Sequence, residues 1–225
     1  MAPTADHGDT DHGGTGLRAR WLKTLLRVRN TDECVFDPYR IADNLLERWA
    51  EPQRRYHTTA HLTAVLDHIG VLEDHADDAD IVRIAAWFHD AVYLPDRSTN
   101  EERSARLAER ALPEAGLTSA QIAEVTRLVR LTVSHDPADG DHNGEVLCDA
   151  DLAVLASEPA AYAAYAAAVR EEYGFVPDEA FRAGRAAVLH QLLALPKLFR
   201  TPHGAAHWEA PARENLTTEL ALLTP

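Results

Sequence analysis

Residues 80–93 read Asp-Ile-Val-Arg-Ile-Ala-Ala-Trp-Phe-His-Asp-Ala-Val-Tyr and place a histidine and an aspartate in a largely apolar segment. The apolar spacing predicts a helix over residues 80–92. Burying an imidazole beside a carboxylate is costly unless the two groups pair with each other or bind a cation. His89 and Asp90 are therefore the first candidates for chemistry. A structural hydrogen bond between them at a helix end is the alternative interpretation.

Helical spacing continues along most of the chain, and there is almost no alternating pattern of the kind that predicts strands. Leu17, Trp21, Leu25 and Val28, for example, repeat at helical intervals. Further helices are expected at residues 39–49, 58–75, 100–112, 118–134, 151–156, 159–173, 178–195 and 208–223. Many helices joined by short loops predict an all-α fold, with one compact helical bundle over residues 17–225.

Local signals mark several ends of these helices. Starts are indicated by Asp37-Pro38, by Thr118 or Ser119 followed by Gln121, and by Asp178 after Pro177. Breaks are expected at residues 51–52, 95–96, 113–116, 137–144 and 202–204, which contain Pro or Gly. Residues 1–16 consist largely of Gly, Asp, Thr and His, with little to bury, so we expect a disordered tail there.

Composition narrows the possible partners. The 225 residues include 36 acidic and 22 basic side chains, for a formal net charge of −14. This charge argues against long nucleic acid, whose phosphates are held mainly by Lys and Arg. A small phosphorylated ligand remains compatible, because a bound cation inverts the sign of one pocket. No apolar run approaches the ~20 residues that span a bilayer, so no membrane association is expected.

Cys34 and Cys148 are the two cysteines, which is too few for a disulfide framework. The first sixteen residues also lack the basic-then-apolar order of a signal peptide. A cytoplasmic location is therefore expected.

Two further segments carry histidines near apolar helices. His57 and His61 are four residues apart, so on a helix they share one face and can converge on one ion. A structural histidine pair is the alternative. His135 follows the helix expected at residues 118–134, where a protonated imidazole is favoured by the helix dipole without any further function.

Asp149 and Asp151 lie in an apolar segment at the expected start of a helix. Either carboxylate can supply a metal ligand. Either can instead cap the helix by accepting hydrogen bonds from the amides of its first turn.

Taken in order, these segments form the pattern His, His-Asp, Asp on separate helices. The sequence here resembles the HD superfamily of metal-dependent phosphohydrolases, and most closely a bacterial subfamily of predicted HD phosphohydrolases. The resemblance covers nearly the whole chain from about residue 20 and is carried by Tyr56-His57-x-x-x-His61, Trp87-Phe88-His89-Asp90-x-Val92-Tyr93, Asn100-Glu101-x-x-Ser104-Ala105, Asp149-Ala150-Asp151-Leu152, Arg170-x-Glu172-Tyr173, Gly184-Arg185 and Ala212-Arg213-x-Asn215-Leu216.

The resemblance implies that His61, His89, Asp90 and one of Asp149 and Asp151 bind a divalent metal ion. His61 is preferred over His57 because a small residue and Val65 follow it, as is common in the family. Asp151 is preferred over Asp149 because of its Ala-Asp-x-x-Leu-like setting. Two imidazoles and two carboxylates suit Mn²⁺, Fe²⁺, Co²⁺, Ni²⁺, Zn²⁺ or Mg²⁺.

The expected reaction is hydrolysis of a small phosphate ester or anhydride, such as a nucleotide, by a metal-activated water. Asp90 would act in both metal binding and catalysis. His57 and His135 would orient the substrate, protonate the leaving oxygen or help to hold a second ion. Two alternatives remain: a di-iron oxygenase of the same superfamily, and a non-catalytic module that binds metal or a nucleotide.

An acidic protein needs local positive charge to hold a phosphate. Arg54 and Arg55 are the first candidates, because a guanidinium binds phosphate oxygens in a bidentate manner. Arg185 and Lys197 are the second candidates, and a surface charge or salt bridge is the alternative for each. The protein is expected to be a monomer or homodimer. The histidines that match no motif, His68, His75, His142, His190, His203 and His207, are expected to be bystanders.

Overall fold

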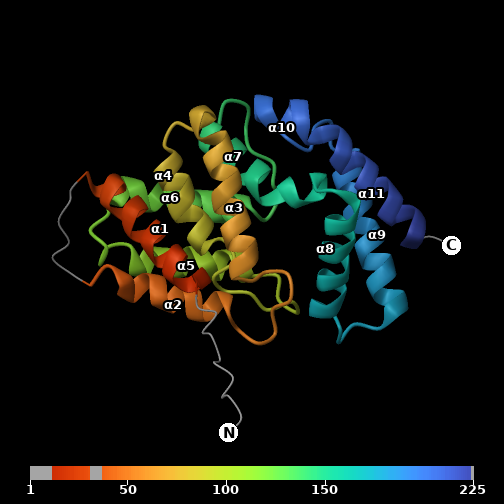
Figure 1. Ribbon diagram of the computed structural model, residues 1–225, viewed down its shortest axis with the longest axis horizontal. Coiled ribbons are helices and arrows are strands. Elements are labelled where there is room, and N and C mark those ends of the chain that lie inside the picture. Colours follow the sequence, from red (N-terminus) through yellow and green to blue (C-terminus); the bar gives the residue numbers. More distant parts are fainter. Residues whose placement is uncertain (1–11, 31–36, 224–225) are drawn as a thin grey trace, which may run out of the picture.

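The computed structural model describes residues 12–30 and 37–223, and every regular element in these ranges is helical. The elements are α1 (His12–Arg29), α2 (Tyr39–Trp49), α3 (Thr59–Leu72), the 3₁₀ helix η1 (Glu73–His75), α4 (Ala79–Phe88), α5 (Asn100–Ala111), α6 (Ser119–Leu131), α7 (His142–Leu152), the 3₁₀ helix η2 (Ala153–Ala156), α8 (Pro159–Glu172), α9 (Asp178–Ala194), α10 (Pro202–His207) and α11 (Glu209–Leu223). The predicted all-α fold is confirmed (Figure 1).

Helix α4 is the centre of the larger part of the fold. Asp78 begins it by accepting hydrogen bonds from the amides of Asp80 and Ile81. Seven of its residues are buried, namely Ile81, Val82, Ile84, Ala85, Ala86, Trp87 and Phe88, and it contacts α1, α3, α5, α6 and α7. Burial on all sides explains why its sequence is almost continuously apolar.

The His-Asp doublet lies at the end of this helix and not inside it. Helix α4 ends at Phe88, four residues before the predicted end, and His89 is its C-cap. The Ala91 amide donates a hydrogen bond to the Phe88 carbonyl, three residues back. The Val92 amide donates one to Ser104 Oγ at 3.0 Å. Because these amides leave the helical pattern, the predicted helix through Val92 is wrong.

The segment before Asp149 and Asp151 also differs from expectation. Helix α7 begins at His142, inside the break predicted at residues 137–144. Asp141 caps it by accepting a hydrogen bond from the Gly144 amide at 3.0 Å. Asp149 and Asp151 therefore lie in the last turns of a helix, and the prediction that either caps a helix start is wrong.

Some of the other predicted helix boundaries agree with the structure and some differ. Thr118 and Gln121 form a complete capping box at the start of α6, and α9 begins at Asp178, as predicted. Helix α6 ends at Leu131, before the predicted residue 134. Pro202–His207 forms a short helix where a break was predicted, because Thr201 caps it. Helix α1 begins at His12, so its first residues belong to a helix and not to the predicted tail, whereas residues 1–11 lie outside the described ranges.

The apolar core consists of two clusters. The larger one joins α1 to α7, and the smaller one joins η2, α8, α9 and α11 with Leu198 and Phe199. Trp208 packs against both clusters. Figure 1 shows α8, α9 and α11 standing beside the larger group of helices. The candidate site lies where the two groups meet.

Within the described ranges, no single helix is long and apolar enough to cross a membrane. The segment His142–Ala156 passes that test only together with Pro159–Glu172, across a bend of 105°. Cys148 is buried in α7, whereas Cys34 lies outside the described ranges.

Candidate metal centre

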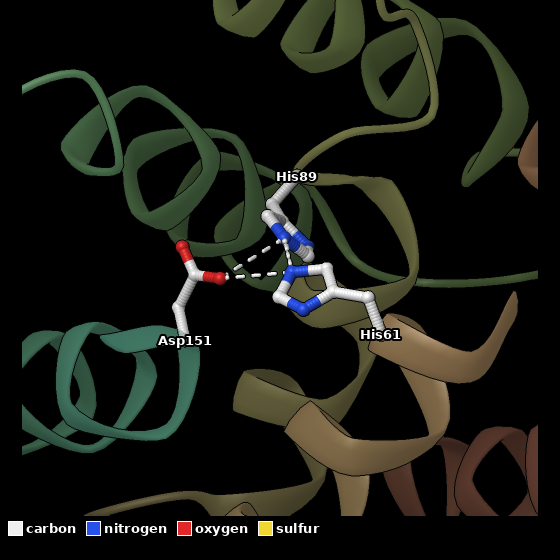
Figure 2. A group of neighbouring side chains, drawn as sticks. All are labelled: His61, His89 and Asp151. Carbon is white, nitrogen blue, oxygen red and sulfur yellow. Dashed lines mark hydrogen bonds and ion pairs between the residues drawn. The ribbon is translucent and has the colours of Figure 1, made fainter. Parts of the chain in front are cut away.

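Three side chains from three helices point toward one another (Figure 2). His61 lies in the first turn of α3, His89 caps the end of α4, and Asp151 lies in the last turn of α7. Asp151 Oδ1 is 3.0 Å from His61 Nε2 and 3.5 Å from His89 Nε2, and the two Nε2 atoms are 3.4 Å apart. These three atoms are a mixed nitrogen and oxygen ligand set.

The chemistry of this set fits a divalent cation. His89 Nδ1 is 2.8 Å from the Ala86 carbonyl, so Nδ1 carries a proton and Nε2 is directed to the centre. His61 and His89 are buried, and their Nε2 atoms face each other. Two facing imidazole nitrogens can share only one proton, whereas a cation between them satisfies both lone pairs and the carboxylate.

Asp90 completes the predicted group of four. Its Oδ2 atom is 3.2 Å from His89 Nε2 and 3.9 Å from His57 Nε2. The structure thus brings together His61, the adjacent His89 and Asp90, and Asp151, which come from three segments far apart in the sequence.

Asp149 is directed elsewhere. Its buried carboxylate accepts hydrogen bonds from the Thr201 amide at 2.8 Å, the Thr201 hydroxyl at 2.7 Å and the Arg200 amide at 2.9 Å. Two positions along an α-helix differ by about 200°, so Asp149 and Asp151 face nearly opposite sides of α7. Asp149 therefore does not join His61 and His89, since its carboxylate holds the segment before α10.

His57 reaches the centre from outside α3. Thr58 is the N-cap of that helix, so His57 precedes it, and the prediction that His57 and His61 share one helical face is wrong. The Nδ1 atom of His57 is 2.7 Å from Glu172 Oε2, and its ring stacks on Tyr93 with centroids 4.2 Å apart. Its Nε2 atom is the one turned toward Asp90.

Glu172 holds this whole segment in place. Its Oε1 atom accepts hydrogen bonds from the amides of Arg55, Tyr56 and His57 at 2.8, 2.9 and 2.9 Å. Burial raises the pKa of the Glu172 carboxyl, but the hydrogen bonds from His57 and from the backbone outweigh it and lower the pKa to about 2. Glu172 is therefore ionised at neutral pH and fixes the orientation of His57.

His135 contacts the other side of Asp151. Its Nε2 atom is 2.8 Å from Asp151 Oδ2. The residue follows α6 in a left-handed conformation, with φ of 49°, which is uncommon outside glycine. The strained backbone turns the imidazole toward the centre.

The charges of the centre stabilise a cation. Burial lowers the pKa of His89, but Asp90 and Asp151 outweigh it and raise that pKa well above its usual range. Burial would raise the pKa of Asp151, yet His89, His135 and His61 hold it well below its usual range. Burial lowers the pKa of His61, which keeps its imidazole available as a neutral ligand.

Three cavities meet at this point. A small one of about 190 Å³ is lined by Asp90, Asp151, His57, His89 and His135, together with Tyr93, Glu101, Thr132 and Tyr173. Two larger ones of about 500 Å³ each lie on either side of Tyr56 and Tyr165, which line both. An organic group therefore has room on either side of the centre.

The four predicted phosphate-binding side chains are placed differently. Arg54 is buried, donates to Glu51 and to the carbonyls of His57 and Ala91, and so supports the site from behind. Arg55 and Arg185 line the two larger cavities. Lys197 is exposed in the segment between α9 and α10.

Arg185 is already paired. Its guanidinium donates to Glu219 at 2.8 and 2.9 Å and to the Tyr165 hydroxyl at 3.2 Å. Arg55 donates to the carbonyls of Pro52 and Arg54, and its side chain is half exposed.

Sequence reasoning did not assign roles to Glu172, Tyr93 and Thr132. Glu172 stands in one of the quoted motifs and Tyr93 in another, but no spacing rule connects either residue to His57. Only the packing of α8 against the segment before α3 shows the connection.

Comparisons with protein-family models, with curated proteins and with solved structures find no match to this chain.

Proposed function

We propose that this protein is a metal-dependent phosphohydrolase of the HD type, acting on a small phosphate ester or anhydride, with nucleotides as the first substrates to test. One observation supports the proposal above all others. The residues of the pattern His, His-Asp, Asp, taken from three separate helices, converge on one buried point beside a cavity.

His61, His89, Asp90 and Asp151 would hold the ion. When bound, a divalent ion would lower the pKa of a water molecule and stabilise negative charge on the phosphoryl group. The ionised carboxylates keep the two imidazoles in place, and burial excludes bulk water from their nitrogens.

His57 and His135 would handle protons. Glu172 accepts a hydrogen bond from Nδ1 of His57, which leaves Nε2 facing the small cavity. From there His57 can donate a proton to the leaving oxygen of the substrate. His135 lines the same cavity and holds the second oxygen of Asp151. These positions suit general acid and orienting roles.

The substrate's organic group would occupy one of the larger cavities. The cavity on the α9 side is lined by Tyr56, Tyr93, Tyr165, Tyr173 and Phe181, with Arg185 at its wall. Aromatic rings and a guanidinium suit a planar organic group attached to a phosphate. The half-exposed Arg55, at the wall of the opposite cavity, is the better phosphate ligand because its side chain makes no buried ion pair.

The test uses the purified protein with Mn²⁺, Co²⁺, Ni²⁺, Zn²⁺ or Mg²⁺ and p-nitrophenyl phosphate, bis-p-nitrophenyl phosphate and a nucleotide panel. Hydrolysis is expected in the wild-type protein and is expected to fall to background in His89→Gln and Asp151→Asn. His203→Gln on α10 is the control and should retain full activity. Equal activity in the wild-type protein and both centre variants would overturn the proposal.

The di-iron alternative has one observation in its favour. The two oxygens of Asp151 face different histidines, with Oδ1 toward His61 and Oδ2 toward His135, as a bridging carboxylate between two ions would. Two irons per chain at this centre, with oxygen consumption and no phosphate release, would favour that reaction over hydrolysis.

A further inference from the structure

A second group of potential ligands lies at the opposite end of the same pair of helices. His75 ends η1, which continues α3, and His142 and Glu145 lie in the first turn of α7. Nε2 of His75 is 2.6 Å from Glu145 Oε2, and the rings of His75 and His142 have centroids 4.8 Å apart. One potential ligand atom from each of the three residues lies within 4.8 Å of the other two.

The residues around His75, His142 and Glu145 add a further negative charge and hold two of these side chains in place. Asp77 Oδ1 is 3.0 Å from His142 Nδ1, so a second carboxylate orients this imidazole. The Glu145 side chain is only 10% exposed, and its Oε1 atom accepts a hydrogen bond from the Gly140 amide at 3.3 Å. A buried carboxylate with two imidazoles beside it is the arrangement that a divalent ion stabilises.

Access and coordination are compatible with an ion taken up from solvent. The side chains of His75 and His142 are 24% and 45% exposed. Two imidazoles and one carboxylate provide three protein ligands, and water can complete a tetrahedral shell. Because imidazole and carboxylate suit Zn²⁺ well, zinc is the ion this group would take.

One electrostatic effect opposes the ion and another supports it. The partial positive charge at the start of α7 disfavours a cation there. The partial negative charge at the end of α3 and η1 acts in the opposite direction at the same place. Because the two helix-end charges oppose each other, the negative carboxylates of Glu145 and Asp77 make the site favourable for a cation.

We propose that His75, His142 and Glu145 form a second, structural metal site that binds one Zn²⁺ ion. The site joins the end of α3 to the start of α7, whereas the candidate metal centre joins the start of α3 to the end of α7. His142 and Asp151 are separated by about 14 Å along α7 at 1.5 Å per residue. An ion at the second site holds α7 against α3 and so supports the position of Asp151.

The test measures zinc per chain after dialysis against a weakly chelating buffer. The wild-type protein is expected to retain two zinc ions, and His75→Gln/His142→Gln is expected to retain one. The control is His203→Gln/His207→Gln, which removes another neighbouring pair of histidines, with ring centroids 4.6 Å apart on α10. It should retain two. Unchanged zinc content in His75→Gln/His142→Gln would overturn the proposal.

A second measurement separates this site from the candidate metal centre. The variant His61→Gln/His89→Gln/Asp151→Asn should still bind one zinc ion by calorimetry, and zinc should raise its thermal unfolding temperature. Adding His75→Gln/His142→Gln to that variant should abolish both effects. Failure of the triple variant to bind zinc, or survival of binding in the combined variant, would show that the second site does not exist.

Discussion

His135 Nε2 lies 2.8 Å from Asp151 Oδ2, while the other oxygen of that carboxylate faces His61. Asp151 is thus held from two sides, by one histidine of α3 and one from the loop after α6. The same histidine has a left-handed backbone, with φ of 49°. A strained residue that aims an imidazole at a buried carboxylate is typical of a functional site.

Changing His135 to Asn should separate catalysis from stability. Asn tolerates the left-handed backbone, so the thermal unfolding temperature should change by only a few degrees. Loss of the imidazole should reduce hydrolysis by about 10²-fold, as is typical for a group that transfers protons. Steady-state hydrolysis and a thermal melt measure the two effects. Full activity in this variant would remove His135 from the mechanism.

Asp149→Asn and Asp151→Asn make the same chemical change two residues apart. The Asp149 variant loses a charged acceptor of three hydrogen bonds and should lose about 2 kcal/mol of the free energy of unfolding, with unchanged metal content at the candidate centre. The Asp151 variant should lose the metal at the candidate centre and the hydrolysis. Urea denaturation and elemental analysis give both quantities. The opposite pattern would exchange the roles of the two residues.

Glu172→Gln should destabilise the protein in a manner that depends on pH. The folded-state pKa of Glu172 is about 2, below the ordinary value of 4.5, so its ionisation stabilises the fold above pH 4.5. That stability is lost as the pH falls from about 4.5 toward 2. At pH 7 the variant should lose on the order of 2 kcal/mol of the free energy of unfolding, allowing for solvent screening.

The difference between Glu172→Gln and the wild-type protein should therefore shrink progressively below pH 4.5. Urea denaturation at pH 7, 4 and 3 measures it. An equal difference at all three values would mean that the Glu172 charge does not stabilise the segment from Arg55 to His57.

Removal of metal should lower the thermal stability, since His61, His89 and the two carboxylates are then left without the ion. Saturation at about a hundred times the dissociation constant adds about 2.7 kcal/mol. For a chain of this length that corresponds to about 5–10 °C. Thermal melts with EDTA and then with excess Mn²⁺ measure the shift, and His61→Gln/His89→Gln should show none from Mn²⁺. A wild-type melt insensitive to both reagents would contradict the proposed centre.

Arg54 and Arg55 should respond differently although they are neighbours. Arg54→Gln removes a buried guanidinium that donates to Glu51 and to two carbonyls, and should cost about 3 kcal/mol of the free energy of unfolding. Arg55→Gln should leave the stability unchanged and raise KM for a phosphate ester with little change in kcat. Denaturation and steady-state kinetics on both variants test this. An unchanged KM in Arg55→Gln would remove that residue from substrate binding.

Much of the local structure follows from near neighbours in the sequence. The apolar run before His89 indicates a buried helix, and the Thr118 and Gln121 pair indicates a helix start, because both signals depend on residues within one or two turns. The order of the candidate histidines and aspartates along the chain is likewise visible in the sequence alone. These features could be predicted without any knowledge of packing.

The ends of the helices are less predictable from the sequence than their existence. The sequence pattern predicts that the helix continues through Val92. The Val92 amide instead donates a hydrogen bond to Ser104, twelve residues away in another helix. The start of α7 cannot be predicted from its neighbours, because Asp141, His142 and Asn143 are polar residues typical of a loop. A competing partner from elsewhere in the fold overrides local preference in the first case.

The sequence by itself determined that the chain is helical and which side chains are candidates for a metal site, since periodicity and residue type act over one or two turns. Only the tertiary structure decided that Asp151 rather than Asp149 faces His61, since their directions depend on how α7 packs against α3. It also decided that His57 pairs with Glu172, and that His75 meets Glu145. Such pairs join residues far apart in the chain, and they form only when the apolar faces of the helices pack together.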